Sequence, residues 1–389
     1  MFSRRVPAEL SPNRIALARE RAEVAFDLTA ANPTACGIPY PERLLDALAD
    51  PRGLAYRPDP RGLASAREAV AAECARLGAA VAADHVVLAA STSEAYAFLF
   101  KLLCEPGEAV LVPTPSYPLF EHLARVEGVG ALPFRLDPAA EWRLDLHELE
   151  RAPESVRAVV VVHPNNPTGS FVHPDDRAAL DALCARRGWA LIADEVFLDY
   201  PLAGGPGSGE SFAASDAGAL TFSLGGLSKS VGLPQLKLAW IVARGPAALL
   251  APALARLEFV ADAFLSVATP VQLALPALLR EGAAVRAAIR RRCEVNLAAA
   301  RAELAAHPAV ALAPPGGGWS AVLRYPAVVG EEELAVELLE RDGVAVHPGF
   351  FFDFPHDGIL VLSLLPSPDL FAEGLRRVLR RIGSHVGAA

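Results

Sequence analysis

Two lysines in this sequence are candidates for covalent chemistry. The 389 residues include 36 basic ones, of which only Lys101, Lys229 and Lys237 are lysines. Lys229 lies in the small-residue stretch 225–230, and Lys237 follows it by eight residues. A lysine that is desolvated in such a loop has a lowered pKa and becomes a nucleophile for Schiff-base formation. A surface lysine is the usual alternative, but this chain uses very few lysines for its surface.

Two polar residues follow or end apolar runs. Asp194 lies within the run 190–196, where a carboxylate is costly unless it is paired. A protonated ring nitrogen would provide that partner, and a buried salt bridge is the alternative. Asn166 follows the run 158–164 and precedes a proline, so its amide is held extended and can donate to a ring oxygen. A plain turn is the alternative there, because Asn, Pro and Gly are common turn residues.

Hydroxyl and aromatic side chains follow two other apolar runs. Thr92 and Ser93 lie after the run 86–90, at the start of a predicted helix, where backbone N–H groups and the helix dipole favour a phosphate. Ordinary N-capping is the alternative. Tyr117 follows the run 109–113 in a loop stiffened by three prolines, where its ring can stack on a planar ligand. A turn tyrosine without a ligand is the commoner case.

The elements that must position these residues form an alternating pattern. Six apolar runs have the length and composition of strands buried on both faces: 86–90, 109–113, 158–164, 190–196, 219–224 and 237–242. Helical patterns lie between several of them, at 93–104, 117–127 and 174–187. This alternation predicts an α/β fold with a mostly parallel sheet flanked by helices. In such sheets ligands bind at the carboxyl ends of the strands, where the candidate residues lie.

The remaining sequence predicts three regions. Residues 1–45 contain several prolines and are expected to form an N-terminal arm and connector. Residues 46–265 are expected to form the large ligand-binding domain. The pattern is helical from about 246 to 306 and then changes to strand–helix–strand–helix over 310–389. We therefore expect a smaller α+β domain over residues 266–389.

Composition excludes several classes of protein. The chain is 52% hydrophobic and carries 45 acidic residues, giving a formal net charge of −9. No basic cluster with interleaved aromatics occurs, which argues against nucleic acid as a partner. No apolar run approaches the length of a membrane span. The five cysteines form no C-x-x-C pair, which argues against a disulfide framework or zinc site and fits a reducing, cytoplasmic compartment. No H-E-x-x-H or G-x-S-x-G motif suggests metal or triad chemistry.

Taken in chain order, these features describe a site for pyridoxal 5′-phosphate (PLP): a phosphate cradle, a stacking aromatic, a ring-oxygen donor, a carboxylate and a Schiff-base lysine. At this point the sequence resembles the fold-type I aminotransferases of class I/II, the aspartate aminotransferase superfamily. The resemblance covers nearly the whole chain and rests on these motifs: ANPTACGIPYP (31–41), LAYRPDPRG (54–62), NNPTG (165–169), ADEV (193–196), LSK (227–229) with a basic residue eight positions later, and VHPGFFFDF (346–354).

The resemblance implies a role for each candidate residue. Lys229 is expected to form the Schiff base with PLP and then to act as general acid and base. Asp194 would pair with the pyridine nitrogen, and Asn166 would hydrogen-bond the 3′-oxygen. Tyr117 would stack on the ring, and Tyr56 would reach across a dimer interface to the partner's phosphate. The residues expected to hold the phosphate within the chain are Thr92, Ser93, Ser228 and Lys237.

Three positions depart from the family pattern. Phe197 stands where the family usually has a tyrosine that helps to bind the 3′-oxygen. Lys237 stands in place of an arginine, which retains the charge but loses the bidentate fork. Val361 stands where an arginine usually clamps the substrate carboxylate. We considered three other arginines as possible substitutes for this clamp: Arg57, Arg61 and Arg324.

The implied function is a homodimeric, PLP-dependent aminotransferase with shared active sites. It would move an amino group from an amino acid to a 2-oxo acid by a ping-pong mechanism. A PLP-dependent lyase acting by β- or γ-elimination is the alternative on the same fold. A non-catalytic PLP-binding regulator is less favoured, because about 45 residues before the fold leave little room for a DNA-binding domain.

Overall fold

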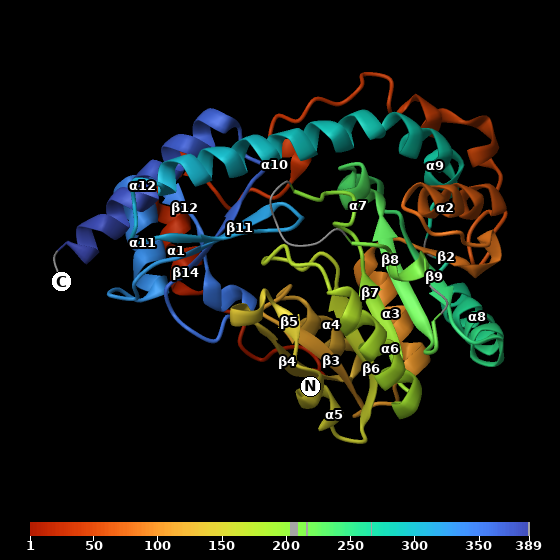
Figure 1. Ribbon diagram of the computed structural model, residues 1–389. Helices are drawn as coiled ribbons and strands as arrows, with labels where there is room; N and C mark the ends of the chain where they lie inside the picture. The colour runs from red at the N-terminus through yellow and green to blue at the C-terminus, as the bar shows by residue number, and fades with distance from the viewer. Residues whose placement is uncertain (203–208, 215–216, 266, 388–389) are drawn as a thin grey trace.

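The computed structural model describes residues 1–202, 209–214, 217–265 and 267–387. Its largest element is an eight-stranded sheet with the order β2-β9-β8-β7-β6-β3-β4-β5 (Figure 1). All six strands that we predicted are present in it, as β2 (Val86–Ala89), β3 (Ala109–Thr114), β6 (Val156–Val162), β7 (Ala190–Asp194), β8 (Thr221–Gly226) and β9 (Ala239–Arg244). Two further strands are β4 (Gly130–Asp137) and β5 (Arg143–Leu144).

The sheet is mostly parallel, as predicted. Strands β8, β7, β6, β3 and β4 run parallel to one another, whereas β9 is antiparallel to both of its neighbours and β5 is antiparallel to β4. Strand β4 was not predicted from the sequence, because it has no continuous apolar run. Most of its residues are exposed or partly exposed, and Pro133 lies within it.

Helices cover both faces of this sheet, because its central strands have apolar side chains on both sides. One face packs against α3 (Thr92–Leu103), α4 (Phe120–Glu127) and α8 (Ala247–Asp262). The opposite face packs against α2 (Ala64–Arg76), α5 (Leu146–Glu150) and α6 (Pro174–Arg187). Helix α4 begins three residues later than the predicted segment. The cause is Pro118, because a proline disfavours the helical conformation of the residue before it.

A smaller, antiparallel sheet has the order β10-β11-β14-β13. Its strands are β10 (Ala311–Ala313), β11 (Ser320–Arg324), β13 (His347–Pro348) and β14 (Ile359–Ser363), and the helices beside it are α11 (Glu331–Asp342) and α12 (Pro368–Val386). This part of the chain holds more strands than the strand–helix–strand–helix order that we expected.

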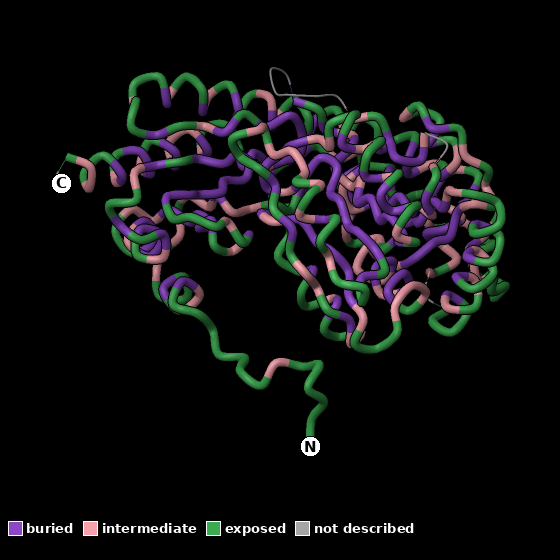
Figure 2. Tube along the Cα trace, turned by 60° about the horizontal axis from the view of Figure 1, so that its bottom comes forward, coloured by how far each residue is buried: buried purple, intermediate pink, exposed green. Residues whose placement is uncertain are grey.

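The N-terminal region contributes to this smaller layer. Helix α1 (Arg14–Arg21) packs on α11, and strand β1 (Phe26–Asp27) pairs in parallel with β12 (Val344–Ala345). Only the first 13 residues form an extended, largely exposed arm (Figure 2). The segment predicted to be an arm and connector therefore contains regular structure from residue 14 onward. The domain boundaries drawn from the sequence stay a prediction.

Two consecutive helices complete the fold. Helix α9 (Thr269–Glu281) packs on α2, and α10 (Ala283–Leu304) extends from α9 to α12 and β10 (Figure 1). Helix α10 thus connects the layer of the large sheet with that of the small one. Among the described helices, none is both long enough and apolar enough to span a membrane.

Candidate active site

The candidate residues gather at one edge of the large sheet. Strands β2, β3, β6, β7 and β8 point in the same direction, so their carboxyl ends meet at this edge. Thr92 and Ser93 begin α3 directly after β2, and Tyr117 follows β3. Asn166 follows β6, and Asp194 is the last residue of β7. Residues from five separate strand ends are therefore presented to one region of the molecule.

Lys229 lies on α7 (Leu227–Ser230), the single helical turn that follows β8. Its amine nitrogen Nζ lies 4.9 Å from the ring centroid of Trp319 and 5.5 Å from that of Phe197. Burial lowers the pKa of Lys229, and the negative charge of Asp194 partly opposes this shift. A lowered pKa increases the fraction of the neutral, nucleophilic amine. This environment is the one that the sequence predicted for a Schiff-base lysine.

The carboxylate of Asp194 is buried and accepts two hydrogen bonds. The hydroxyl of Tyr96 donates to Oδ2 at 3.0 Å, and the backbone N–H of Val196 donates to Oδ1 at 3.2 Å. Burial raises the pKa of Asp194 to about 6, although both hydrogen bonds and the charge of Lys229 lower it. No described cation lies within ion-pair distance of Asp194, so the salt-bridge alternative is not what the structure shows. A protonated ring nitrogen would supply the cationic partner.

The start of α3 is arranged as a capping box. Ser91 Oγ accepts from the backbone N–H of Glu94 at 3.1 Å, and the Glu94 carboxylate accepts from the backbone N–H of Ala90 at 2.6 Å. Ser91 and Glu94 therefore serve as the cap. The side-chain hydroxyls of Thr92 and Ser93 take part in no hydrogen bond with another described residue. They are thus free of the cap, and their role toward a phosphate stays a prediction.

Asn166 lies where the two sheets approach each other. Its Oδ1 accepts a hydrogen bond from Ser320 Oγ of β11 at 3.3 Å, which leaves the amide N–H groups to donate. Gly169, the glycine of the NNPTG motif, has a φ of +71°, and an added Cβ would lie 2.5 Å from the carbonyl oxygen of Gly317. A glycine is therefore required there, because a side chain would collide with the segment before β11.

Tyr117 and Lys237 are both exposed. The Tyr117 ring packs edge-on against Phe120, with centroids 6.0 Å apart. Burial raises the pKa of Tyr117, and the negative charge of Asp194 raises it further. The Tyr117 hydroxyl is therefore close enough to Asp194 to interact with its charge. Lys237 is exposed and has a left-handed backbone with φ of 52°. No ion pair engages Lys237 within the described chain, so its role toward phosphate stays a prediction.

Two of the positions that depart from the family pattern, Phe197 and Val361, have apolar surroundings. Phe197 is 9% exposed and packs edge-on against Trp319, with ring centroids 5.3 Å apart. Val361 on β14 is 2% exposed and lies opposite Val322 in a cluster with Phe352. The place of the family's clamping arginine is thus filled by a packed apolar cluster.

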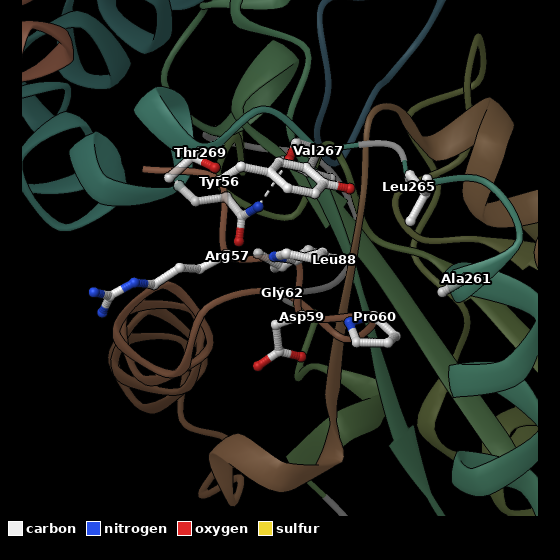
Figure 3. A pocket seen from close by; sticks show the side chains of 12 residues that line it. Tyr56, Arg57, Asp59, Pro60, Gly62, Leu88, Ala261, Leu265, Val267 and Thr269 are labelled. Carbon is white, nitrogen blue, oxygen red and sulfur yellow. Dashed lines mark hydrogen bonds between the residues drawn. The ribbon is translucent and has the colours of Figure 1, made fainter. Parts of the chain in front are cut away.

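The alternative arginines do not form a clamp beside this cluster. Arg61 pairs with Glu258, with Nε 3.2 Å from the carboxylate. Arg324 is exposed at the end of β11, four residues beyond Ser320. Arg57 lies beside a pocket and its side chain points away from it (Figure 3).

Tyr56 lies in the same pocket but apart from the other candidates. Its side chain is 76% exposed, and the pocket is lined by Gly62, Leu88, Leu265 and Thr269 among others (Figure 3). No hydrogen bond or ring contact joins Tyr56 to another candidate residue in the described part of the chain. Within a single chain the structure therefore does not bring Tyr56 to Lys229.

Tyr96 and Trp319 are among the residues that contact the candidates and that sequence reasoning missed. Tyr96 lies four residues after Thr92, so both are on one face of α3, and this spacing was the signal that could have revealed it. Trp319 is one of only four tryptophans and follows three glycines. Nothing in its neighbourhood along the chain indicates that it lies beside Lys229.

Comparisons with known proteins agree with this geometry. Residues 31–369 match the family described as aminotransferase class I and II. The chain belongs to this family. It is 30% identical to an arginine–pyruvate transaminase of Pseudomonas aeruginosa over 343 residues, covering 85% of this chain and 82% of that protein. It superposes with a TM-score of 0.81 on a mutant aspartate aminotransferase of Thermus thermophilus, at 25% identity, covering 98% of this chain and 99% of that one.

One similar protein has a different activity in its name. An S-alkyl-thiohydroximate lyase of Arabidopsis thaliana is 30% identical over 244 residues, which is 62% of this chain and 52% of that protein. The chain spans about half the length of several of the curated relatives that it matches. The α/β fold with a large, mostly parallel sheet flanked by helices is nevertheless shared along the whole chain.

Members of class I and II use pyridoxal 5′-phosphate, and the donor set at this sheet edge fits that group. Among the described residues no cation lies within ion-pair distance of Asp194, and a protonated pyridine nitrogen would provide one. Thr92 and Ser93 have free hydroxyls at a helix N-terminus, where a phosphate is favoured. The amine of Lys229 is partly desolvated, as Schiff-base formation requires.

Proposed function

We propose that this protein is a PLP-dependent aminotransferase that moves an amino group from an amino acid to a 2-oxo acid by a ping-pong mechanism. The observation that carries the proposal is that a buried amine and a buried carboxylate lie at the ends of the adjacent strands β8 and β7. Lys229 is an amine whose pKa is lowered by burial, and Asp194 is a carboxylate whose pKa is raised to about 6. Titratable groups shifted in this way cluster at functional sites.

Each residue of the site has a task in this reaction. Bound PLP supplies an electron sink for the electrons released at the α-carbon of the substrate. Asp194, oriented by Tyr96 and Val196, holds a proton on the ring nitrogen, because a buried carboxylate strongly favours a cation beside it. Asn166 is oriented by Ser320 to donate to the 3′-oxygen. Thr92, Ser93, Ser228 and Lys237 are proposed to hold the phosphate, and Tyr117 to stack on the ring.

Lys229 is proposed to move the proton. Its Nζ serves first as the point of cofactor attachment and then, once released, as the base that takes the proton from the α-carbon of the substrate. A lowered pKa suits both tasks, because the neutral amine is the nucleophile and the base. The rings of Trp319 and Phe197 exclude water on one side of this amine.

A donor panel tests the proposal. The purified holoenzyme is mixed with single amino acids in the absence of any 2-oxo acid, and the absorbance of the bound cofactor is followed. An aminotransferase converts its cofactor to the pyridoxamine form and stops after one half-reaction. Addition of a 2-oxo acid should then restore the original spectrum. A panel in which no amino acid changes the spectrum of a correctly loaded enzyme contradicts the proposal.

A PLP-dependent lyase is the second candidate, and the similarity to the Arabidopsis lyase favours it. The same panel separates the two activities. A lyase turns over repeatedly without an added 2-oxo acid, releases pyruvate or 2-oxobutanoate from a suitable substrate, and leaves the cofactor in its original form. Release of pyruvate from S-substituted cysteines, or of 2-oxobutanoate from S-substituted homocysteines, without pyridoxamine formation would replace the aminotransferase proposal.

The active enzyme is proposed to be a homodimer with shared active sites. Exposed apolar side chains gather near Tyr56: Leu54 is 93% exposed, Phe259 79% and Leu265 63%. A second copy of the chain would cover this surface and bring its Tyr56 to the phosphate. Mixing Lys229→Ala with Tyr56→Ala chains should restore part of the activity, because one site in each mixed dimer keeps both residues. A monomeric mass in solution would contradict this proposal.

The remaining proposals concern location and organisation. The five cysteines are free, which fits a reducing, cytoplasmic compartment. We propose that nucleic acid is not a partner, because the chain carries a net charge of −9. The division into an arm and connector (1–45), a large PLP-binding domain (46–265) and a small C-terminal domain (266–389) is proposed from sequence, and limited proteolysis can test it.

A further inference from the structure

The turn that carries Lys229 has few backbone donors for its carbonyl groups: the N–H of Gly232 donates to the carbonyl oxygen of Lys229 at 3.3 Å, and the N–H of Leu233 donates to that of Leu227 at 2.9 Å. The last four carbonyls of any α-helix lack intrahelical partners, and α7 has only four residues in total. The hydroxyl of Tyr200 donates to the carbonyl oxygen of Lys229 at 2.5 Å. Nε of Arg286 donates to the carbonyl oxygen of Ser230 at 2.9 Å. Two side chains from distant parts of the sequence therefore hold the backbone of the lysine turn.

A buried network of charges fixes these two donors. Arg286 at the start of α10 pairs with Asp199, with Nε 3.3 Å from the carboxylate, and also with Glu73 of α2. Arg76 pairs with the same two carboxylates. Asp199 directly precedes Tyr200, so the network fixes the backbone from which the Tyr200 hydroxyl reaches Lys229. The network contains two arginines and two carboxylates, so its positive and negative charges balance.

Tyr200 also touches the surroundings of the lysine amine. Its ring is fully buried and packs edge-on against Trp319, with centroids 5.1 Å apart. Trp319 in turn lies 4.9 Å from Nζ of Lys229. Burial raises the pKa of Tyr200 well above its usual value, so the hydroxyl stays protonated and remains a donor. Tyr200 thus acts on Lys229 at its backbone directly and at its amine through Trp319.

We propose that Tyr200 is a positioning residue for Lys229, held in place by Arg286 and Asp199. This inference rests on the proposed function, in which Lys229 attaches the cofactor and moves the proton. Tyr200 does not contact the reacting atoms. It fixes the backbone of the turn so that Nζ is presented to the cofactor in one orientation. Such orientation contributes to the rate of the chemical step more than to substrate affinity.

The test compares two substitutions that each remove one buried tyrosine hydroxyl. Tyr200→Phe deletes the donor to Lys229. Tyr325→Phe deletes a hydroxyl that is also buried and has no hydrogen-bond partner among the described residues, so it is the matched control. Both retain the ring. We expect Tyr200→Phe to lower kcat roughly ten-fold with KM nearly unchanged, which corresponds to one hydrogen bond of about 1.4 kcal/mol. We expect Tyr325→Phe to leave kcat within two-fold of the wild type.

A second measurement does not depend on turnover. The cofactor-free enzyme is mixed with PLP, and attachment to Lys229 is followed by visible absorbance. We expect attachment to be several-fold slower in Tyr200→Phe and unchanged in Tyr325→Phe. Equal attachment rates and equal kcat in all three proteins would overturn the proposal. So would a Tyr200→Phe enzyme whose KM rises as much as its kcat falls, because that result indicates a general loosening of the site.

A Tyr200→Phe chain that does not fold and a wild type that transfers no amino group can be told apart. If Tyr200→Phe does not fold, Arg286→Lys keeps the charge beside Glu73 and Asp199 but removes Nε from Ser230, and it should slow attachment in the same way. Unchanged attachment in Arg286→Lys would then overturn the proposal. If the wild type attaches PLP at Lys229 but transfers no amino group, the proposed function fails. The attachment rates would still decide whether Tyr200 positions the lysine.

Discussion

The turn that carries Lys229 and the strand that carries Val361 differ sharply in polarity. The lysine turn is surrounded by polar partners: Asp194 lies near the amine, and Tyr200 and Arg286 hold the backbone. Around Val361 the small sheet presents a packed apolar cluster. By the resemblance to the family, the lysine side keeps Lys229, Asp194 and Asn166 but departs at Phe197 and Lys237. The small sheet has Val361 where the family usually has a charged residue. We propose that cofactor chemistry and substrate recognition are built on separate layers of the fold and can change independently.

Removal of the lysine amine on the polar side should have the largest effect on activity. We expect Lys229→Ala to lower kcat by at least roughly a thousand-fold, since the group that attaches the cofactor and moves the proton is lost. Lys101→Ala is the control, because Lys101 lies on α3 and pairs with Glu127. After borohydride reduction of the wild type, mass spectrometry should find the pyridoxyl group on Lys229. Finding it on Lys101 or Lys237 would refute the assignment.

Placing the family's arginine back on the apolar side should be costly to the fold. We expect Val361→Arg to lower the free energy of unfolding by roughly 3–5 kcal/mol, because a charge is buried without a partner. Val328→Arg is the control, since Val328 is 49% exposed. Urea denaturation measures both. A stable Val361→Arg enzyme with tighter binding of amino acids would show that this position is open to the substrate carboxylate.

The buried carboxylate on the polar side should make the cofactor-free protein sensitive to pH. The folded-state pKa of Asp194 is raised to about 6 from 3.8, so the folded state binds the proton more tightly. The associated stability is present below about pH 4 and is lost as the pH rises through about 6. Its size is on the order of 2–3 kcal/mol. Asp194→Asn should remove this part of the pH dependence.

Urea denaturation of the cofactor-free protein at pH 4.5 and 7.5 tests this expectation. The control is Asp262→Asn, because Asp262 is exposed and its carboxyl makes no ion pair with a described residue. Loading with PLP should flatten the dependence of the wild type, since a ring cation beside Asp194 lowers its pKa. An identical pH dependence in the wild type and Asp194→Asn would contradict the assigned environment.

The smallest expected effect concerns Phe197, which lies between the two regions. A tyrosine hydroxyl at this position would add a hydrogen bond to the ionised 3′-oxygen, and such bonds to charged groups are worth about 1.5–3 kcal/mol. Phe197→Tyr should therefore lower the pKa of the attached cofactor by on the order of one unit. A spectral titration measures it, with the exposed Phe259→Tyr as control. An equal or higher pKa would show that another donor already occupies this place.

Much of the large sheet could be predicted because its strands are continuous apolar runs. The runs 158–164 and 190–196 became β6 and β7, and the residues that follow them lie where parallel strands place ligand groups. Strand β4 could not be found in this way, because its exposed residues interrupt the pattern. Helix α1, within the segment 1–45, was not predicted either. Helix α1 packs on α11, which lies more than 300 residues away in the sequence. The sequence around α1 gives no indication of that contact.

The sequence by itself determined the identity and chain order of the chemical groups. The sequence alone identifies Asn166, Asp194 and Lys229, because each lies at or shortly after the end of an apolar run. Since the strands formed by these runs are parallel, the three residues lie at the same edge of the large sheet. Only the tertiary structure decided what surrounds them. Tyr96, Tyr200, Trp319 and Arg286 come from four separate elements and meet the site through packing. Burial and long-range contacts set the pKa values of Asp194 and Lys229, because desolvation depends on the whole fold and not on neighbours in sequence.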